Sequence, residues 1–266
     1  MNVKSAVEAI YAVLNHTDIS TQDFLLTATA LESFLTGTTT FAFHPVRCTT
    51  TDGLLYHEAL LRHTRADGRR VSPLSILNRF EWAGAQAELE AMLLVPLALQ
   101  QAEQALVQGQ SVSINLSPRT LLQNNTRTHL LAYLDQKRVL GLNPAQVVFE
   151  LTEDGGFPTV CIGNMMVDTL RSRGFKVALD DFGSGVHRMG HEEFHHLDVD
   201  FVKIDFKVVK AARNCPQALE KLHTKVAYVH EHFGGVPIIA EGVKDVAHAR
   251  ELAALDIPYA QYFVAD

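Results

Sequence analysis

The sequence has few cysteines, and they are not arranged for cross-linking. Only three occur in 266 residues: Cys48, Cys161 and Cys215. They are far apart and odd in number, which argues against a disulfide framework and against a zinc knuckle. Such cysteine usage is typical of a protein from a reducing compartment.

Long apolar runs and clusters of basic residues are also missing. The apolar runs are too short to cross a bilayer, and the N-terminal sequence MNVKSAVEAI lacks the basic start and apolar block of a signal peptide. The formal net charge is −7, and no lysine or arginine cluster offers a surface to a nucleic-acid polymer or an anionic membrane. We therefore expect a cytoplasmic protein with no nucleic-acid polymer and no membrane as partner. The net charge does not exclude a small anionic ligand.

The sequence does contain a rhythm of compact apolar runs separated by longer segments of helical spacing. Strands that are buried on both faces have near-continuous apolar runs. Eight such runs with helical crossovers, including the segment from Gln86 to Val107, predict an α/β fold of the (β/α)8 TIM-like barrel type. The predicted strands are 41–48, 54–62, 111–117, 147–153, 176–183, 201–205, 237–243 and 259–263.

The start of the chain departs from this rhythm in two ways. Only TTTDG separates the first two strands, and an Asp-Gly turn there predicts a hairpin, so the first strand should be antiparallel to the second. Residues 1–36 have the pattern of two amphipathic helices, the second from Thr21 to Leu35. We therefore expect an accessory element over 1–36, which could hold a dimer together or bind a protein partner, and a barrel domain over 37–266.

Polar residues gather late in, or just after, seven of the eight apolar runs. Barrel enzymes collect their catalytic groups at the carboxyl ends of the strands, so these side chains should converge. Five carboxylates and one amide cannot all stay ionised together without cations, and oxygen ligands favour Mg²⁺ or Mn²⁺ over zinc or copper. The polar residues are Glu58, Asn115, Glu150, Asp180, Asp181, Lys203, Glu241 and Gln261.

Two of these carboxylates are adjacent, in the stretch ALDDFGSG at 178–185. One aspartate could bridge two metal ions about 3.5 to 4 Å apart while its neighbour binds only the second, an arrangement used for in-line displacement at phosphorus. Taken alone, the pair could instead cap a turn, with Gly183 and Gly185 supplying unusual dihedral angles.

The other residues also have ordinary structural alternatives. Asn115 could cap a helix that begins near Pro118, and Lys203 could be the ion-pair partner of Asp205. Glu241 could be a solvated loop acid. Because all these alternatives would have to hold together by coincidence, we favour one functional site.

Six motifs in order carry a family resemblance: HEALLR, INLS, FELTE, LDDFG, VKID and IAEGV. Together they resemble the EAL-domain family of cyclic di-GMP-specific phosphodiesterases, over residues 40–264. The resemblance implies hydrolysis of cyclic di-GMP to linear pGpG, by in-line attack of water at a site with two Mg²⁺ or Mn²⁺ ions. It also implies a homodimer.

The resemblance implies which residues bind metal and which act in catalysis. One ion would be bound by Glu58, Asn115, Glu150 and Asp180, and the second by Asp180, Asp181 and Glu241. The catalytic groups would be Lys203, Glu241 and Glu58, with Lys203 beside the attacking water.

Three further residues would contact the ligand. Arg62 of HEALLR would bind a substrate phosphate, a role that suits a guanidinium fork. Gln261 would lie near the same centre. His44 stands where the family usually has glutamine before proline in its first strand, and it would alter a contact to the nucleotide.

Other departures from the family pattern bear on activity. The loop at 183–190 reads GSGVHRMG, Lys244 replaces an acid close to Glu241, and Gln261-Tyr262 stands where the family has Gln-Gly. These changes surround the predicted metal ligands and spare them, which favours catalysis. The alternative is a catalytically weak EAL domain that acts as a cyclic di-GMP sensor or a protein-binding regulator.

A competing motif, HEEFH at 191–195, matches the H-E-x-x-H pattern in which two histidines bind zinc and the glutamate acts as a base. It would indicate a zinc peptidase. The chain has 13 histidines, which makes a chance match easier, and no third-ligand motif follows at short spacing. We therefore regard the peptidase as the weakest alternative and interpret these histidines as a polar helix surface.

Overall fold

The computed structural model describes residues 2–152, 160–183 and 197–262. The chain forms two compact units that alternate along the sequence. Unit 1 comprises 1–42, 59–108 and 119–142, and unit 2 comprises 43–58, 109–118 and 143–266. The predicted metal-binding and catalytic residues all belong to unit 2.

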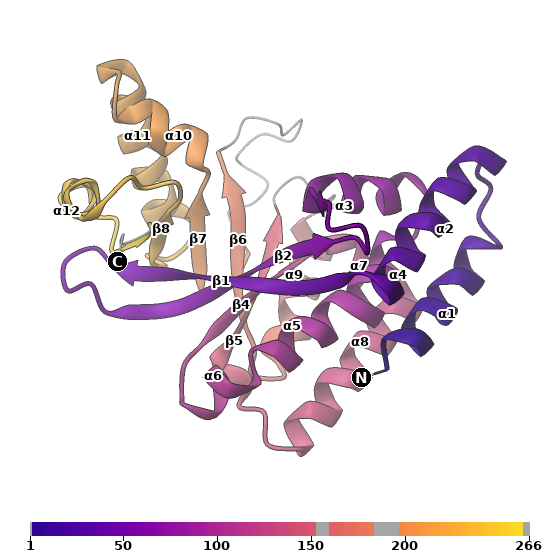
Figure 1. Ribbon diagram of the computed structural model, residues 1–266. Helices are drawn as coiled ribbons and strands as arrows, with labels where there is room; N and C mark the ends of the chain where they lie inside the picture. The colour runs from indigo at the N-terminus through magenta and orange to yellow at the C-terminus, as the bar shows by residue number, and fades with distance from the viewer. Residues whose placement is uncertain (1, 153–159, 184–196, 263–266) are drawn as a thin grey trace. The chain divides into compact units, whose positions relative to one another are not determined.

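The strands form one sheet that closes on itself. They are β1 (Thr38–Cys48), β2 (Leu54–Thr64), β3 (Arg70–Val71), β4 (Val112–Leu116), β5 (Val147–Thr152), β6 (Lys176–Phe182), β7 (Phe201–Ile204), β8 (Ile238–Ala240) and β9 (Tyr259–Gln261). Their order is β1-β9-β8-β7-β6-β5-β4-β2-β3, and pairing of β1 with β2 closes an eight-stranded barrel (Figure 1). All eight predicted strands are confirmed, whereas the short β3, which pairs with β2, was not predicted.

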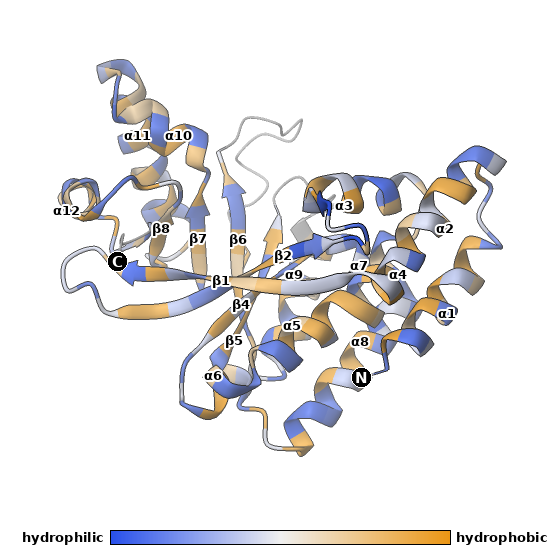
Figure 2. Cartoon of the chain, viewed as in Figure 1, coloured by the Kyte–Doolittle hydropathy of each residue, from blue (hydrophilic) through white to orange (hydrophobic). Residues whose placement is uncertain are grey.

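Strand direction in the barrel is mixed. From β4 to β9 each strand is parallel to its neighbours in sequence. β1 pairs with β9 in the antiparallel sense, with Val46 opposite Gln261, which confirms the antiparallel first strand. The parallel strands are apolar because both faces are covered, and every residue of β7 and β8 is buried. Figure 2 shows the change from hydrophobic to hydrophilic residues toward the arrowheads of β6 and β7.

The helices of unit 2 cover the later strands. They are η2 (Pro144–Gln146), α9 (Val160–Arg171), α10 (Phe206–Ala212), α11 (Pro216–His232) and α12 (Val246–Ala253). α9 packs against β6, and α12 packs against β9. α10 begins where the Asp205 carboxylate accepts a hydrogen bond from the N–H of Lys207 at 2.6 Å. α11 buries Leu222, Val226 and Val229, which recur at helical spacing.

The remaining helices lie wholly or mostly in unit 1. They are α1 (Val3–Leu14), α2 (Thr21–Thr36), α3 (Pro73–Trp82), α4 (Gln86–Leu89), η1 (Glu90–Leu94), α5 (Val95–Gln101), α6 (Glu103–Val107), α7 (Pro118–Leu122) and α8 (Asn124–Val139). α1 and α2 confirm the two predicted N-terminal helices, and Ile10 and Leu31 join a core that includes Phe80 and Leu93. The helical run predicted from Gln86 to Val107 is confirmed, with a π-helical turn at η1. Within the described ranges, no helix combines the length and the apolar character needed to span a bilayer.

Candidate metal and catalytic site

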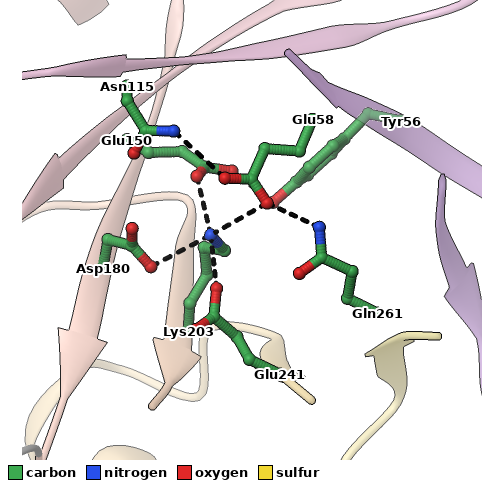
Figure 3. A network of polar contacts seen from close by, with 8 residues as sticks. All are labelled: Tyr56, Glu58, Asn115, Glu150, Asp180, Lys203, Glu241 and Gln261. Carbon is green, nitrogen blue, oxygen red and sulfur yellow. Dashed lines mark hydrogen bonds and ion pairs between the residues drawn. The ribbon is translucent and has the colours of Figure 1, made fainter. Parts of the chain in front are cut away.

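The polar residues predicted at the strand ends meet in one cluster (Figure 3). Seven of them come from seven different strands or from the residue directly after one, and Asp181 follows Asp180 on β6, so closure of the barrel brings them together. Their sources are β2 for Glu58, β4 for Asn115, β5 for Glu150, β6 for Asp180, β7 for Lys203, the end of β8 for Glu241 and β9 for Gln261.

Lys203 is the centre of the cluster and is fully buried. Its Nζ lies 2.6 Å from Glu150 Oε2, 2.7 Å from Glu241 Oε1 and 3.0 Å from Asp180 Oδ1. Glu58 Oε2 is a fourth neighbour at 3.6 Å. Burial alone would lower the pKa of Lys203, but the four carboxylates outweigh burial and raise this pKa well above its ordinary value. Lys203 is therefore a fixed cation.

Glu58 is held from two sides by amide groups. Asn115 Nδ2 donates to Glu58 Oε1 at 3.0 Å, and Gln261 Nε2 donates to Glu58 Oε2 at 2.5 Å. Burial alone would raise the pKa of Glu58, but Lys203 and these two hydrogen bonds outweigh burial and lower it. Glu58 therefore stays an anion at neutral pH, and the helix-capping alternative for Asn115 does not account for its contact with Glu58.

Asp180 and Asp181 lie on a β-bulge, where two residues of β6 lie opposite one residue of β7, Lys203. In a regular strand two adjacent side chains point to opposite faces. Asp181 instead has a φ of 57°, in the left-handed region that aspartate tolerates better than most residues. As a result, ligand oxygens of Asp180, Asp181 and Glu241 all lie within 4.8 Å of one another.

Tyr56 is a site residue that sequence reasoning missed. Its hydroxyl donates to Glu150 Oε1 at 3.1 Å, while Lys203 binds the other oxygen of the same carboxylate. Burial and the charge of Glu58 raise the pKa of Glu150 well above its ordinary value despite Lys203. The signal that could have found Tyr56 is its position two residues before Glu58, because alternate residues of a strand share a face.

The cluster carries too little positive charge to keep all its acids ionised. Burial raises the pKa of Glu241 to about 8, and the charge of Asp180 adds to this shift. Burial also raises the pKa of Asp181 to about 7, with Asp180 and Asp205 adding to the shift. Among the described residues Lys203 is the only buried lysine or arginine, so the metal-free cluster keeps protons at neutral pH.

The raised pKa of Glu241 predicts how the stability of metal-free protein changes with pH. The unfolded chain loses the Glu241 proton near pH 4, whereas the folded protein keeps it until about pH 8, so the folded state binds more protons between these values. The free energy of unfolding should therefore fall by about 1 kcal/mol between pH 7 and pH 9 relative to a Glu241→Gln variant. Urea unfolding in EDTA across this range measures the difference. Parallel pH profiles of the two proteins would contradict the prediction.

The residues of the cluster fit hard divalent cations. Asp180 Oδ1 is buried and has no hydrogen bond within the described part of the chain, although Lys203 Nζ lies 3.0 Å away. Asp180, Asp181 and Glu241 offer three carboxylate oxygens close enough to bind one ion. Oxygen-only donor sets of this kind suit Mg²⁺ and Mn²⁺.

The remaining predicted site residues are Arg62 and His44. Arg62 belongs to unit 1, is exposed, and donates from Nη1 to the carbonyl oxygen of Leu61 at 2.9 Å. His44 is half-buried in β1. Ligand binding by Arg62 and His44 stays a prediction. The HEEFH motif at 191–195 and most of the loop at 183–190 lie outside the described residues.

The fold and the cluster together define a mixed-direction α/β barrel with an acidic centre whose carboxylates fit a divalent cation. Comparison with family models gives this class a name. Residues 28–265 match the EAL domain, so the chain belongs to the EAL domain family.

Known proteins with similar sequences or folds agree with this membership. Cyclic di-GMP phosphodiesterase PdeB from Shewanella oneidensis is 31% identical over 208 residues, which are 77% of this chain and 23% of PdeB. An EAL domain protein from Listeria monocytogenes has a TM-score of 0.71 at 21% identity and covers 92% of both chains. BlrP1 from Klebsiella pneumoniae, in a manganese and cyclic di-GMP complex at pH 9.0, has a TM-score of 0.65 at 23% identity over 85% of this chain and 54% of BlrP1.

These similarities differ in what they cover. The structural matches establish the shared barrel fold. The chain spans between 21% and 23% of the length of three curated relatives, PdeB among them, so those relatives contain much sequence with no counterpart here.

Proposed function

We propose that the protein hydrolyses one phosphodiester bond of cyclic di-GMP and releases linear pGpG. The observation that carries this proposal is the set of four carboxylates around buried Lys203, at the end of the barrel where barrel enzymes perform their chemistry. Membership of the EAL domain family and the similarity to PdeB support the choice of reaction and substrate.

The proposed reaction uses two Mg²⁺ or Mn²⁺ ions. One would be held by Glu58, Asn115, Glu150 and Asp180, and the other by Asp180, Asp181 and Glu241. When bound, the ions would lower the pKa of water and offset the negative charge of the phosphate. The manganese in the BlrP1 complex supports this choice of metal.

The protein's own residues bind, orient and stabilise charge. Lys203 has a pKa far above neutrality, so it donates hydrogen bonds and stabilises negative charge, and it does not act as a general base at neutral pH. Asn115 and Gln261 each fix one oxygen of Glu58, which sets the orientation of that carboxylate. Tyr56 does the same for Glu150.

The alternative is an EAL domain that binds cyclic di-GMP without cleaving it. Lys244, an exposed cation three residues after Glu241, favours retention of an anionic ligand near the cluster. Its Nζ lies 3.7 Å from Asp245 Oδ2, an exposed contact that leaves much of its charge available.

Metal removal and replacement test the proposal. Protein treated with EDTA should form no pGpG, and addition of Mg²⁺ or Mn²⁺ should restore turnover, because the donor set suits these ions. Chromatography of pGpG measures turnover, and calorimetric titration measures binding of cyclic di-GMP in parallel. Binding without turnover in either metal would favour the sensor. Product formation in EDTA at the full rate would contradict the metal-dependent reaction.

A further inference from the structure

A part-buried hydrogen bond ties the end of β9 to the turn between β1 and β2. The Tyr262 hydroxyl donates to Asp52 Oδ1 at 2.6 Å, and the Tyr262 side chain is only 2% exposed. Tyr262 directly follows Gln261, whose amide binds Glu58. This contact is therefore one residue away from the cluster while being no part of it.

Asp52 is itself held firmly in the turn. Its N–H donates to the carbonyl oxygen of Cys48 at 3.0 Å, and its φ of 60° lies in the left-handed region. Arg47 Nη1 donates to the carbonyl oxygen of Asp52 at 3.0 Å and lies 3.8 Å from Asp52 Oδ2. The carboxylate that receives the Tyr262 hydroxyl is thus oriented by its own turn, so it can fix the position of Tyr262.

The same turn holds both partners of the Gln261–Glu58 hydrogen bond. On one side it leads directly into β2, which carries Glu58. On the other side it holds β9 at both ends, since Thr49 Oγ1 donates to the carbonyl oxygen of Ile257 at 3.0 Å before the strand and Asp52 binds Tyr262 after it. A shift at the end of β9 would change the 2.5 Å contact between Gln261 and Glu58.

We propose that Tyr262 is a positioning residue, which acts through Gln261 to hold the Glu58 carboxylate in the orientation that metal binding and turnover need. The effect on turnover rests on the proposed function, whereas the effect on Mn²⁺ affinity rests on metal binding alone. Groups that orient a metal ligand typically change metal affinity or activity by about ten- to a hundredfold when removed.

A double-mutant cycle tests whether Tyr262 acts through Gln261. The four proteins are the wild type, Tyr262→Phe, Gln261→Ala and the double variant, each characterised by kcat, KM, Mn²⁺ affinity and thermal unfolding. Tyr262→Phe should lower kcat and weaken Mn²⁺ binding about tenfold, with KM nearly unchanged. The same change should have almost no effect in the Gln261→Ala background, because the group it positions is gone.

Two further variants separate positioning from general stability. Tyr259→Phe makes the identical chemical change on the same strand and should leave kcat and Mn²⁺ affinity unchanged. Asp52→Asn keeps an oxygen that can accept the Tyr262 hydroxyl, so it should retain most of the activity that Tyr262→Phe loses.

Equal losses from Tyr262→Phe in both backgrounds, or wild-type values for that variant, would overturn the inference. A wild type that binds Mn²⁺ without turnover would refute the proposed function alone, and the Mn²⁺ arm of the cycle would still decide the role of Tyr262. A wild type that neither binds Mn²⁺ nor turns over would overturn both.

Discussion

Asp180→Asn should lower kcat for cyclic di-GMP about a thousandfold while the protein stays folded. In the proposed reaction Asp180 would bind both ions, and an amide of the same shape lacks the negative charge that this role needs. Charge stabilisation by a metal ion is worth several kcal/mol, which corresponds to about this factor in rate. Chromatography of pGpG gives kcat, and thermal unfolding with and without Mn²⁺ checks the fold and the metal site together.

Asp198→Asn is the matched control for this change. Asp198 is an exposed aspartate of the same unit, and its side chain pairs with Arg171 away from the cluster. Its substitution should leave kcat within about twofold of the wild type, since exposed ion pairs contribute little. Retention of a tenth or more of the activity by folded Asp180→Asn would contradict the assignment of Asp180 to both ions.

The sequence predicted the barrel well because its strands are buried on both faces. A run such as VVFEL has apolar residues on both faces, which predicts a strand buried between helices. These residues form β5. The Asp-Gly turn at Asp52 likewise predicted a hairpin with a reversed first strand, and β1 runs antiparallel to its other neighbour, β9. The two-residue β3 was missed because Arg70 and Val71 alone form no pattern. The sequence did not predict that α1 and α2 share one core with α3 in unit 1. That core depends on tertiary contacts, which no local pattern contains.

The sequence also predicted which side chains would meet, but not how they would be arranged. Position late in or just after a strand places Lys203 and Glu241 at one end of the barrel whatever their detailed contacts. Glu58 joins them from the fifth of the eleven residues of β2, and this strand extends further than the sequence predicted. The central position of Lys203 among carboxylates follows from the register between β6 and β7. The bulge that turns both Asp180 and Asp181 into the cluster is visible in the sequence only as a break in strand alternation.

Lys203→Met should destabilise the metal-free protein by about 3 to 5 kcal/mol at neutral pH, and it should abolish turnover. Removal of one partner from a buried ionic network leaves its other charges uncompensated, and such changes cost about this much. Glu150 and Glu241 lose contacts of 2.6 Å and 2.7 Å to the ammonium. Urea unfolding at pH 7.5 in EDTA measures the loss. Lys176→Met, a lysine on neighbouring β6 whose Nζ lies 5.8 Å from the Phe201 ring centroid, should change stability by about 1 kcal/mol or less.

Two rescue experiments distinguish uncompensated buried charge from simple misfolding as the cause of this destabilisation. Glu58→Gln in the Lys203→Met background removes the carboxylate that stays ionised beside Lys203 and should restore part of the stability. Mn²⁺ should stabilise the Lys203→Met variant more than the wild type, since the ions supply the positive charge that the ammonium no longer provides. Stability would then return without turnover, because the metal ions do not replace the hydrogen bonds that Lys203 donates. Turnover that returns with Mn²⁺ would contradict a catalytic role for Lys203 and leave it a structural cation of the metal-free barrel.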